Sequence, residues 1–394
     1  MPVSSPLEAG VDVSEARSRQ LKKPKLPALT GLRAFAALNI VFFHFSNPAW
    51  FGPFAPIVNN GFTSVSFFIL LSGFILAYNY SERGQRGELR VRDFYMARLS
   101  RLYPVYLFAL LLSTGMLLQE YHAWDHDHFV AGTVLTPLLL QGWSVKLATF
   151  WNTPAWTMST EGFFYVLFPL LIRWKRPQSF KWVIALLLGL WAAGMVCPWL
   201  YVHFNPDGDP HPGRYTTGYW MRALKFTPPP HLPSFLFGVV LADLHSRIHA
   251  ASWVRLLLGA IGVSGLYAVL YYGDHLPYAM LHDGLLMPLF GLAILGLAGQ
   301  NVVSKFFSFL PFVLIGESSY CLYLIHFNLW TLIHESGALE KTGLIRLDPW
   351  LSYALLILGA MMTMWWIERP GQRWIRGLKW SRPVRLNPVS MGGD

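Results

Sequence analysis

Arg33 and His44 stand eleven residues apart in an otherwise uncharged, apolar stretch that runs from Leu29 to Asn47. In a helix, eleven residues turn by about 1100°, which is about 20° more than three full turns. Both side chains then project from one face, about 16 Å apart along the axis. An arginine inside a membrane span costs roughly 2.5 kcal/mol or more unless it meets water or a polar partner. The pair therefore predicts a polar path along this helix; the alternative is an Arg33 that snorkels to the interface and a His44 bonded to a backbone carbonyl.

Arg98 and Arg101 form a second group whose spacing suits anion binding. On a helix, residues three apart project about 60° from one another and about 4.5 Å along the axis, so two guanidinium groups can close on one phosphate or diphosphate. Basic residues are also common at the cytoplasmic end of membrane helices, so this signal is weak alone. Because Arg33 is expected at the same cytoplasmic level, we predict an inner mouth with three arginines.

Glu161 is an acid within the apolar segment 155–172. We expect it about one and a half turns inside the outer boundary, at a depth comparable with His44. A carboxylate and an imidazole at matching depth can form the base and the orienting group of proton-transfer catalysis. The alternative is that Glu161 accepts hydrogen bonds at the N-terminus of its helix, where the helix dipole favours negative charge. Trp151 and Trp156 nearby are interpreted as interface anchors.

Ser72 and His326 are two further polar residues inside apolar segments. Ser72 belongs to a run of small residues that favours close helix packing, and its hydroxyl could also donate to a substrate. His326 lies nine residues after Glu317, on a segment that is expected to head outward. The two cysteines, Cys197 and Cys321, are expected to pack as small hydrophobic residues and are given no chemistry.

The loop after the third apolar segment contains residue types that bind metals. A zinc site needs its ligands held in tetrahedral geometry, and a flexible outer loop gives no sign of such a frame. No metal is therefore expected at this cluster: His122, Asp125, His126, Asp127 and His128.

The composition requires a membrane protein. Of the 394 residues, 54% are hydrophobic and only 13% are charged, against roughly 25% charged residues in ordinary soluble domains. Uncharged runs close to the roughly 20 residues of a spanning helix recur along the chain, and proline and asparagine residues divide the first, longer run into two helices. Two further segments, at 155–172 and 308–333, hold one acid each and bring the number of predicted membrane helices to ten. The uncharged runs are 34–81, 102–119, 182–206, 226–242, 256–273, 284–304 and 349–367.

Charge asymmetry orients these ten predicted helices. The basic N-terminal region lacks the features of a signal peptide and is expected to stay in the cytoplasm. This start places 24 of the 31 Lys and Arg residues on the inner side and six outside, with Arg33 within the first helix, as the positive-inside rule requires. The net charge of +10 therefore reports topology and anionic lipid, and nucleic-acid binding is a poor interpretation of it. We predict an all-α polytopic membrane protein with cytoplasmic termini: a tail at 1–26, a ten-helix domain at 27–378 and a tail at 379–394.

Five of these segments, in this order, resemble the acyltransferase-3 family of integral membrane acyltransferases. The resemblance spans roughly residues 27–378. The sequence departs from the family pattern at Gly162, where many relatives carry a second acid, and at His231 and Ser234, which replace what is often Arg and Glu. The matching pieces are Arg33 with His44, Phe67 to Phe74 around Ser72, Arg98 with Arg101 and Pro104, Trp156 to Glu161 with Tyr165, and Ser319-Tyr320 to His326.

The resemblance implies a ten-helix fold in the bacterial cytoplasmic membrane and an acyl-CoA donor, with acetyl-CoA as the expected one. It also implies transfer to a hydroxyl on the outer side or within the membrane, on an envelope glycan, a lipid-linked sugar or a small molecule. Arg33 and His44 match the family's essential pair, and Arg98 and Arg101 match its basic motif near the donor. No soluble hydrolase-like domain is expected after the tenth helix, so the active site is expected to lie in the membrane.

These expectations combine into an O-acyltransferase. The donor phosphates would bind Arg98 and Arg101, the pantetheine arm would pass Arg33, and His44 would act as the general base, with Glu161 orienting it or binding the acceptor. A covalent acyl-enzyme step stays open. The rival hypothesis is a proton-coupled transporter, which predicts internal repeat symmetry that we do not find. Substrate contacts are expected from Ser72, Trp156, Ser159, Tyr165 and His326.

Overall fold

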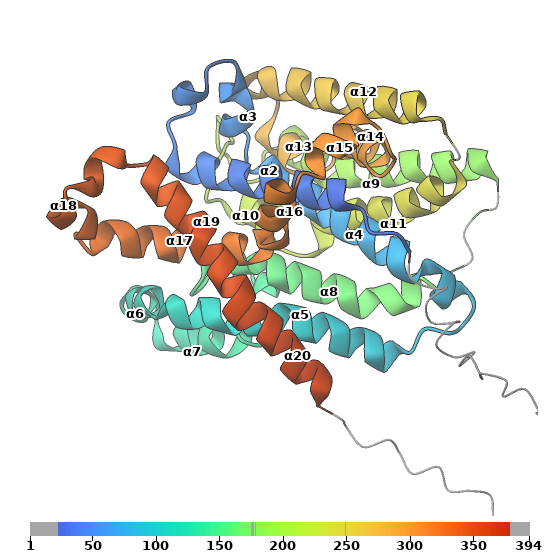
Figure 1. Ribbon diagram of the computed structural model, residues 1–394. Coiled ribbons are helices and arrows are strands. Elements are labelled where there is room, and N and C mark those ends of the chain that lie inside the picture. The colour runs from blue at the N-terminus through green and yellow to red at the C-terminus, as the bar shows by residue number, and fades with distance from the viewer. Residues whose placement is uncertain (1–22, 175–176, 178, 249, 379–394) are drawn as a thin grey trace, which may run out of the picture.

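The computed structural model describes residues 23–174, 177, 179–248 and 250–378 (Figure 1). These ranges are helical and contain no strand, which confirms the all-helical fold class. Most of the predicted N-terminal tail, to residue 22, and the predicted C-terminal tail from residue 379 lie outside the described residues. The longer helices are α2 (Pro27–Phe45), α4 (Thr63–Gln85), α5 (Val91–Leu112), α8 (Trp156–Leu171), α9 (Phe180–Phe204), α11 (Leu232–Arg247), α12 (Ser252–Tyr271), α14 (Met287–Leu297), α17 (Ser319–Glu335) and α19 (Trp350–Thr363).

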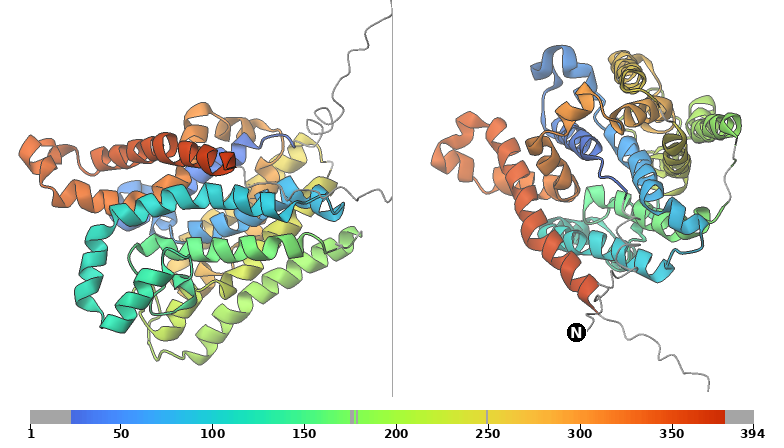
Figure 2. Two further views of the ribbon diagram at one scale, coloured as in Figure 1. Left: turned by 90° about the horizontal axis from the view of Figure 1, so that it is seen from below. Right: turned by 45° about the vertical axis from the view of Figure 1, so that its right-hand side comes forward.

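Shorter helices connect or extend the longer ones. The long helices run roughly side by side, and α6 and α18 lie at one end of the bundle (Figure 2). The short helices are α3 (Ala55–Asn59), α6 (Thr114–Ala123), α7 (His126–Leu135), α10 (Tyr219–Phe226), α13 (Tyr278–His282), α15 (Val302–Phe307), α16 (Leu310–Glu317), α18 (Ala338–Thr342) and α20 (Arg369–Gly377).

The predicted division of the first apolar run is confirmed. α2 starts with Pro27 at its first turn, where a missing N–H costs nothing, and it ends at Phe45. Asn47 then accepts a hydrogen bond from the Ala49 amide and caps the short 3₁₀ segment η1 (Pro48–Phe54). Arg33 and His44 therefore share one unbroken helix.

The third crossing differs from its prediction. The uncharged run 102–119 placed Arg98 and Arg101 at a helix mouth, but α5 begins at Val91, so they lie about two and three turns inside it. Polar residues in the first turns hide the helix start from a hydropathy pattern. α6 begins within the predicted run 102–119 and extends into the predicted flexible loop, which also forms α7. Asp125 caps α7 by accepting from the His128 amide at 3.1 Å.

Each of the ten predicted apolar segments overlaps a described helix, and the protein is polytopic. Six spans are long and apolar enough to cross a membrane, and two bent pairs raise the number to eight within the described residues. The bends are 62° between α5 and α6 and 64° between α16 and α17. α8 and α11 have 16 residues each, about 24 Å, and account for the remaining two segments. Ten crossings thus remain a prediction.

Four of the described glycines each bring their helix into backbone contact with a neighbouring helix. Where a glycine faces another helix, a Cβ atom would overlap a carbonyl oxygen of that helix, so only glycine allows the approach. The packing role expected for small residues in 61–80 is confirmed for Gly73. The pairs are Gly31 with Phe307, Gly316 with Thr30, Gly73 with Phe235 and Gly238 with Leu70.

The orientation of the bundle is tested by single-cysteine labelling in a background without Cys197 and Cys321. We expect cysteines at Asp127, Asp209 and Lys341 to react with an impermeant reagent in sealed cells, because these positions follow odd-numbered predicted crossings. Cysteines at Arg90 and Arg373 should react only after permeabilisation, which also serves as the control for reactivity. Labelling of position 373 in sealed cells would contradict the ten-helix map.

Candidate active site

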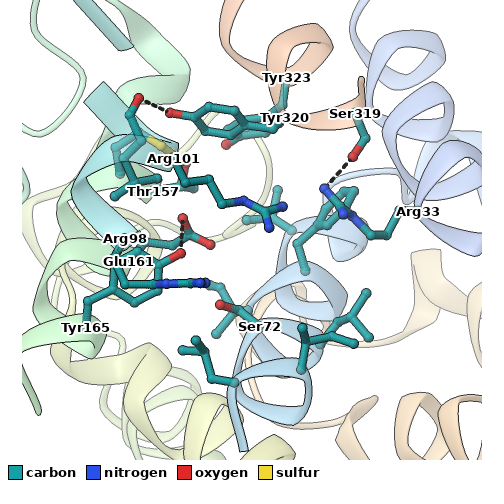
Figure 3. A pocket seen from close by; sticks show the side chains of 18 of the residues that line it. Arg33, Ser72, Arg98, Arg101, Thr157, Glu161, Tyr165, Ser319, Tyr320 and Tyr323 are labelled. Atoms are coloured by element: carbon teal, nitrogen blue, oxygen red, sulfur yellow. Dashed lines mark hydrogen bonds between the residues drawn. The ribbon is translucent and has the colours of Figure 1, made fainter. Parts of the chain in front are cut away.

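A cavity of about 300 Å³ lies between α2, α4, α5, α8 and α17 (Figure 3). Helices from both halves of the sequence thus converge on it. Three arginines and one glutamate give it its charge, and aromatic and aliphatic side chains form the rest of its wall. The polar and aromatic lining residues are Thr30, Arg33, Phe68, Ser72, Arg98, Arg101, Thr157, Glu161, Tyr165, Ser319, Tyr320 and Tyr323.

Arg33 is held at the cavity by α17. Its Nη2 donates to Ser319 Oγ at 2.8 Å across 286 residues of sequence. Gly316, just before the bend that starts α17, lies against the Thr30 carbonyl one turn from Arg33. This close approach explains how a serine hydroxyl reaches the guanidinium. The inner end of the predicted polar path therefore has a polar partner, as a buried arginine requires.

Arg98 and Arg101 reach the same cavity from α5 (Figure 3). Arg98 Nη2 donates to the Tyr80 hydroxyl at 3.2 Å, and its guanidinium carbon lies 5.9 Å from the centre of the Tyr165 ring. Arg98 Nε is buried without a hydrogen-bond partner among the described residues. An unpaired buried donor is costly, so Arg98 Nε is a group for which the described residues supply no acceptor.

Glu161 lies with the arginines and not beside His44, which corrects the predicted carboxylate–imidazole pair. Its Oε2 accepts from the Tyr165 hydroxyl at 3.2 Å, and its charge neighbours are Arg101, Arg33 and Arg98. Equal depth in the membrane does not imply contact, because α8 presents this carboxylate to α5 instead. Glu161 thus partly balances the positive charge of the cavity.

His44 has a histidine as its neighbour at the end of the path opposite Arg33. Its ring centre lies 5.5 Å from that of His326 and 4.6 Å from that of Phe327, both on α17. α2 and α17 therefore carry polar pairs at two levels, Arg33 with Ser319 and His44 with His326. Neither histidine lines the cavity, which ends at Tyr323 on the turn before His326.

The hydrogen bonds of His326 define its protonation pattern. His326 is 1% exposed, and its Nδ1 lies 2.6 Å from the Tyr323 carbonyl oxygen. Since a carbonyl only accepts, Nδ1 carries the proton and Nε2 keeps a lone pair. Nε2 is buried and has no partner among the described residues. A free lone pair beside His44 is suited to accepting a proton or a hydrogen bond.

Two predicted substrate contacts have other uses in the structure. Trp156, predicted as an interface anchor, is 5% exposed and packs against the ring of His231 at 5.2 Å. Ser159 is buried and donates to the Leu139 carbonyl at 2.6 Å. Neither lines the cavity, because both point from α8 away from the face that carries Glu161. Ser72 and Tyr165 do line it.

Two polar groups were not anticipated. Arg214, from the segment between α9 and α10, donates to the Phe43 carbonyl at 3.3 Å and lies 3.5 Å from His44 Nδ1. Asp283 lies between two buried histidines: 2.8 Å from His231 Nδ1 and 3.3 Å from His282 Nδ1. The sequence spacing predicts neither the contact of Arg214 with His44 nor that of Asp283 with His231, because these partners are 170 and 52 residues apart; His282 is the chain neighbour of Asp283.

The residues of metal-binding type around Asp125 have other contacts in the structure. Within the described ranges, no group of three His, Cys, Asp or Glu residues is placed to hold a metal ion. Asp125 instead caps α7 and contacts His128 Nδ1 at 2.6 Å. These hydrogen bonds hold the pKa of the Asp125 carboxyl below its usual value.

Comparison with known protein families places this chain in one of them. The acyltransferase-3 family, described as an acyltransferase domain, matches residues 26–369, which is most of the chain. The chain belongs to the acyltransferase-3 family. The matched residues include Arg33, His44, His326 and every residue that lines the cavity. No solved structure matches this acyltransferase.

Among its relatives are named acyltransferases. It is 29% identical to the acyltransferase MdmB of Streptomyces mycarofaciens over 77% of its own length and 78% of that protein. It is 22% identical to the peptidoglycan O-acetyltransferase OatA of Listeria monocytogenes over 90% of its own length, and 24% identical to the O-acetyltransferase OatA of Staphylococcus aureus over 81%. The chain spans only 57% and 53% of the length of these two OatA proteins.

Proposed function

We propose that this acyltransferase moves an acetyl group from cytoplasmic acetyl-CoA to a hydroxyl of an envelope glycan, a lipid-linked sugar or a small molecule, in the bacterial cytoplasmic membrane. The observation that carries the proposal is the cavity of three arginines joined by α2 and α17 to a histidine pair. Its ends supply the two requirements of the reaction, an anion site for the donor and a proton acceptor for the hydroxyl.

The donor end of the site is the arginine cavity. A volume of about 300 Å³ is at the lower limit for ligand pockets, and it suits the narrow pantetheine arm better than a whole nucleotide. The phosphates would meet Arg98 and Arg101, and the arm would pass Arg33 toward His44. The thioester then travels about 16 Å along α2 between these two residues. In this assignment Glu161 limits the net charge of the empty cavity.

The reaction end is the histidine pair. His44 takes the proton of the acceptor hydroxyl while the hydroxyl oxygen attacks the thioester carbonyl carbon. When the carbon–sulfur bond breaks, the leaving thiolate receives this proton and departs as the free thiol. This step needs an unprotonated base within hydrogen-bond reach of the acceptor hydroxyl. The acceptor approaches from the outer side, where the segment between α9 and α10 covers His44.

The function is tested by thiol release and product formation with purified full-length protein. We expect acetyl-CoA to yield free thiol only when a hydroxyl acceptor from a panel of glycans, lipid-linked sugars and small alcohols is present. The acetylated acceptor is identified by mass spectrometry. Protein with His44→Gln is the control for adventitious hydrolysis. No thiol release with acetyl-CoA or longer acyl-CoA across the panel would contradict the proposal.

Arg98→Ala and Arg101→Ala test the donor site. Each removes one charge-assisted contact worth about 1.5–3 kcal/mol, so the donor KM should rise by about 10- to 100-fold, more than kcat falls. The matched control is Arg90→Ala, because Arg90 is an exposed arginine at the start of the same helix and does not line the cavity. An unchanged donor KM in both cavity variants would show that these arginines do not bind the donor.

A further inference from the structure

Arg214 is a charged side chain that contacts the end of α2 at Phe43 and His44. Its Nη1 donates to the Phe43 carbonyl at 3.3 Å, and its Nη2 lies 3.5 Å from His44 Nδ1. The guanidinium carbon also lies 3.8 Å from the centre of the Phe43 ring, a close cation–π contact. Three separate contacts thus fix one guanidinium beside the proposed base.

The chain between α9 and α10 is built to hold Arg214 in place. Lys225 is 5% exposed, and its Nζ donates to the carbonyl oxygens of Arg214 at 2.9 Å and Thr216 at 3.4 Å. Thr216 donates in turn to Asp209 Oδ2 at 2.6 Å. Hydrogen bonds from Thr216 and the His211 amide lower the pKa of Asp209, so this anchor is charged at neutral pH. The buried Lys225 ammonium donates to backbone oxygens of this segment and thereby holds the Arg214 backbone in one position.

The contact also defines the tautomer of His44. A guanidinium only donates, so Nδ1 of His44 is the acceptor and Nε2 carries the proton in the resting state. His326, whose ring centre is 5.5 Å away, presents an unprotonated Nε2. The basic nitrogen of His44 is therefore the one beside Arg214, and the reacting hydroxyl must approach at that nitrogen.

We propose that Arg214 is a catalytic residue that stabilises the oxyanion formed when the acceptor hydroxyl attacks the donor thioester at His44. This inference rests on the proposed O-acyl transfer. The hydroxyl proton passes to His44 Nδ1 as the new carbon–oxygen bond forms, and the carbonyl π electrons move onto oxygen, next to the guanidinium. Collapse of this intermediate restores the carbonyl, breaks the carbon–sulfur bond and returns the proton to the thiolate.

The guanidinium suits an oxyanion because of its donors and its location. Arg214 has five N–H groups, and its contacts with Phe43 and His44 use two of them, at long distances of 3.3 and 3.5 Å. Both contacts can shift by a few tenths of an ångström toward a stronger acceptor. Pre-placed donors at developing charge lower the barrier because they need no reorganisation during the reaction.

Arg214→Gln, Arg214→Lys and Arg214→Ala test the proposal in full-length purified protein. We expect Arg214→Gln to lower kcat by about 10²-fold, with KM for donor and acceptor within a few fold of wild type, as for loss of one oxyanion donor. Arg214→Lys should keep part of the activity because it retains the charge. Millimolar guanidinium chloride should restore turnover to Arg214→Ala, a response that a purely structural role would not give.

The control is Arg346→Gln, because Arg346 is an exposed arginine on the same predicted side of the membrane. It should have wild-type kinetics. A higher acceptor KM with unchanged kcat in Arg214→Gln would overturn the catalytic role in favour of recognition of an anionic acceptor. If Arg214→Gln unfolds, the other two variants still test the catalytic role. Folded Arg214→Ala that guanidinium does not rescue would overturn it. Arg214→Lys with wild-type kcat and no response to guanidinium would overturn it as well. Failure of wild-type protein to transfer acyl groups would instead overturn the proposed function itself, and the oxyanion role with it.

Discussion

His44→Gln should lower the turnover of acyl transfer by about 10²- to 10⁴-fold, the usual range for loss of a general base. Glutamine keeps the size and some hydrogen bonding of the side chain but has no basic nitrogen, so it separates base catalysis from positioning. His44→Lys should also be nearly inactive, because a protonated amine cannot accept the hydroxyl proton. The measurement is the steady-state rate of acyl transfer at saturating donor and acceptor, and donor binding is measured in parallel.

The matched control is His203→Gln. His203 is an exposed histidine on α9 that stacks on Trp199, and its replacement should leave turnover unchanged. Donor binding by His44→Gln should also stay near the wild-type value, because the arginine cavity lies at the other end of α2. Turnover close to wild type in folded His44→Gln would remove His44 from the mechanism. The role of general base would then belong to His326 or Glu161.

Gly316→Ala should abolish acyl transfer and lower the melting temperature. The new Cβ would overlap the Thr30 carbonyl, so α16 must move away from α2. Overpacking of this kind costs about 1–3 kcal/mol, and more where the opposing atom belongs to a backbone. The same movement separates Arg33 from Ser319 and displaces α17, which carries His326. Melting and acyl transfer are measured in one detergent.

Gly189→Ala is the control for this prediction. Gly189 lies within α9, is exposed on the bundle surface, and would place its Cβ in open space. Alanine is favoured over glycine in a helix by up to about 1 kcal/mol, so the control should be neutral or slightly stabilising. Gly316→Ala protein with wild-type melting and activity would show that the approach of α16 to α2 does not position the site.

The local pattern of residues was sufficient to find the ten longer helices of the described residues and the face shared by Arg33 and His44. Helical period and apolar length are properties of neighbouring residues, so a one-dimensional sequence contains them. Helix starts were less accurate, as for α5, because Val91 begins it amid polar residues that a hydropathy pattern assigns to a loop. The resemblance to the acyltransferase-3 family added a function that the residue spacing did not contain.

Partner choice inside the bundle required the packed structure. Glu161 was expected near His44 because both were placed at one depth, yet the rotation of α8 directs it to Arg98 and Arg101. Depth follows from counting residues along one helix. The direction of a side chain toward a neighbour depends on how two helices are rotated and crossed, and this depends on contacts such as the one between Gly316 and Thr30.

Arg214 illustrates the same division between local and distant information. In sequence it is one of six basic residues that are predicted to lie on the outer side, 170 positions from His44, in a segment rich in Pro, Gly and Tyr. Its place beside His44 results from hydrogen bonds of Lys225, Thr216 and Asp209 that close the segment onto the end of α2. The sequence specifies which charges and helices the protein has; their pairing arises from packing, because distant residues meet only when the helices are assembled.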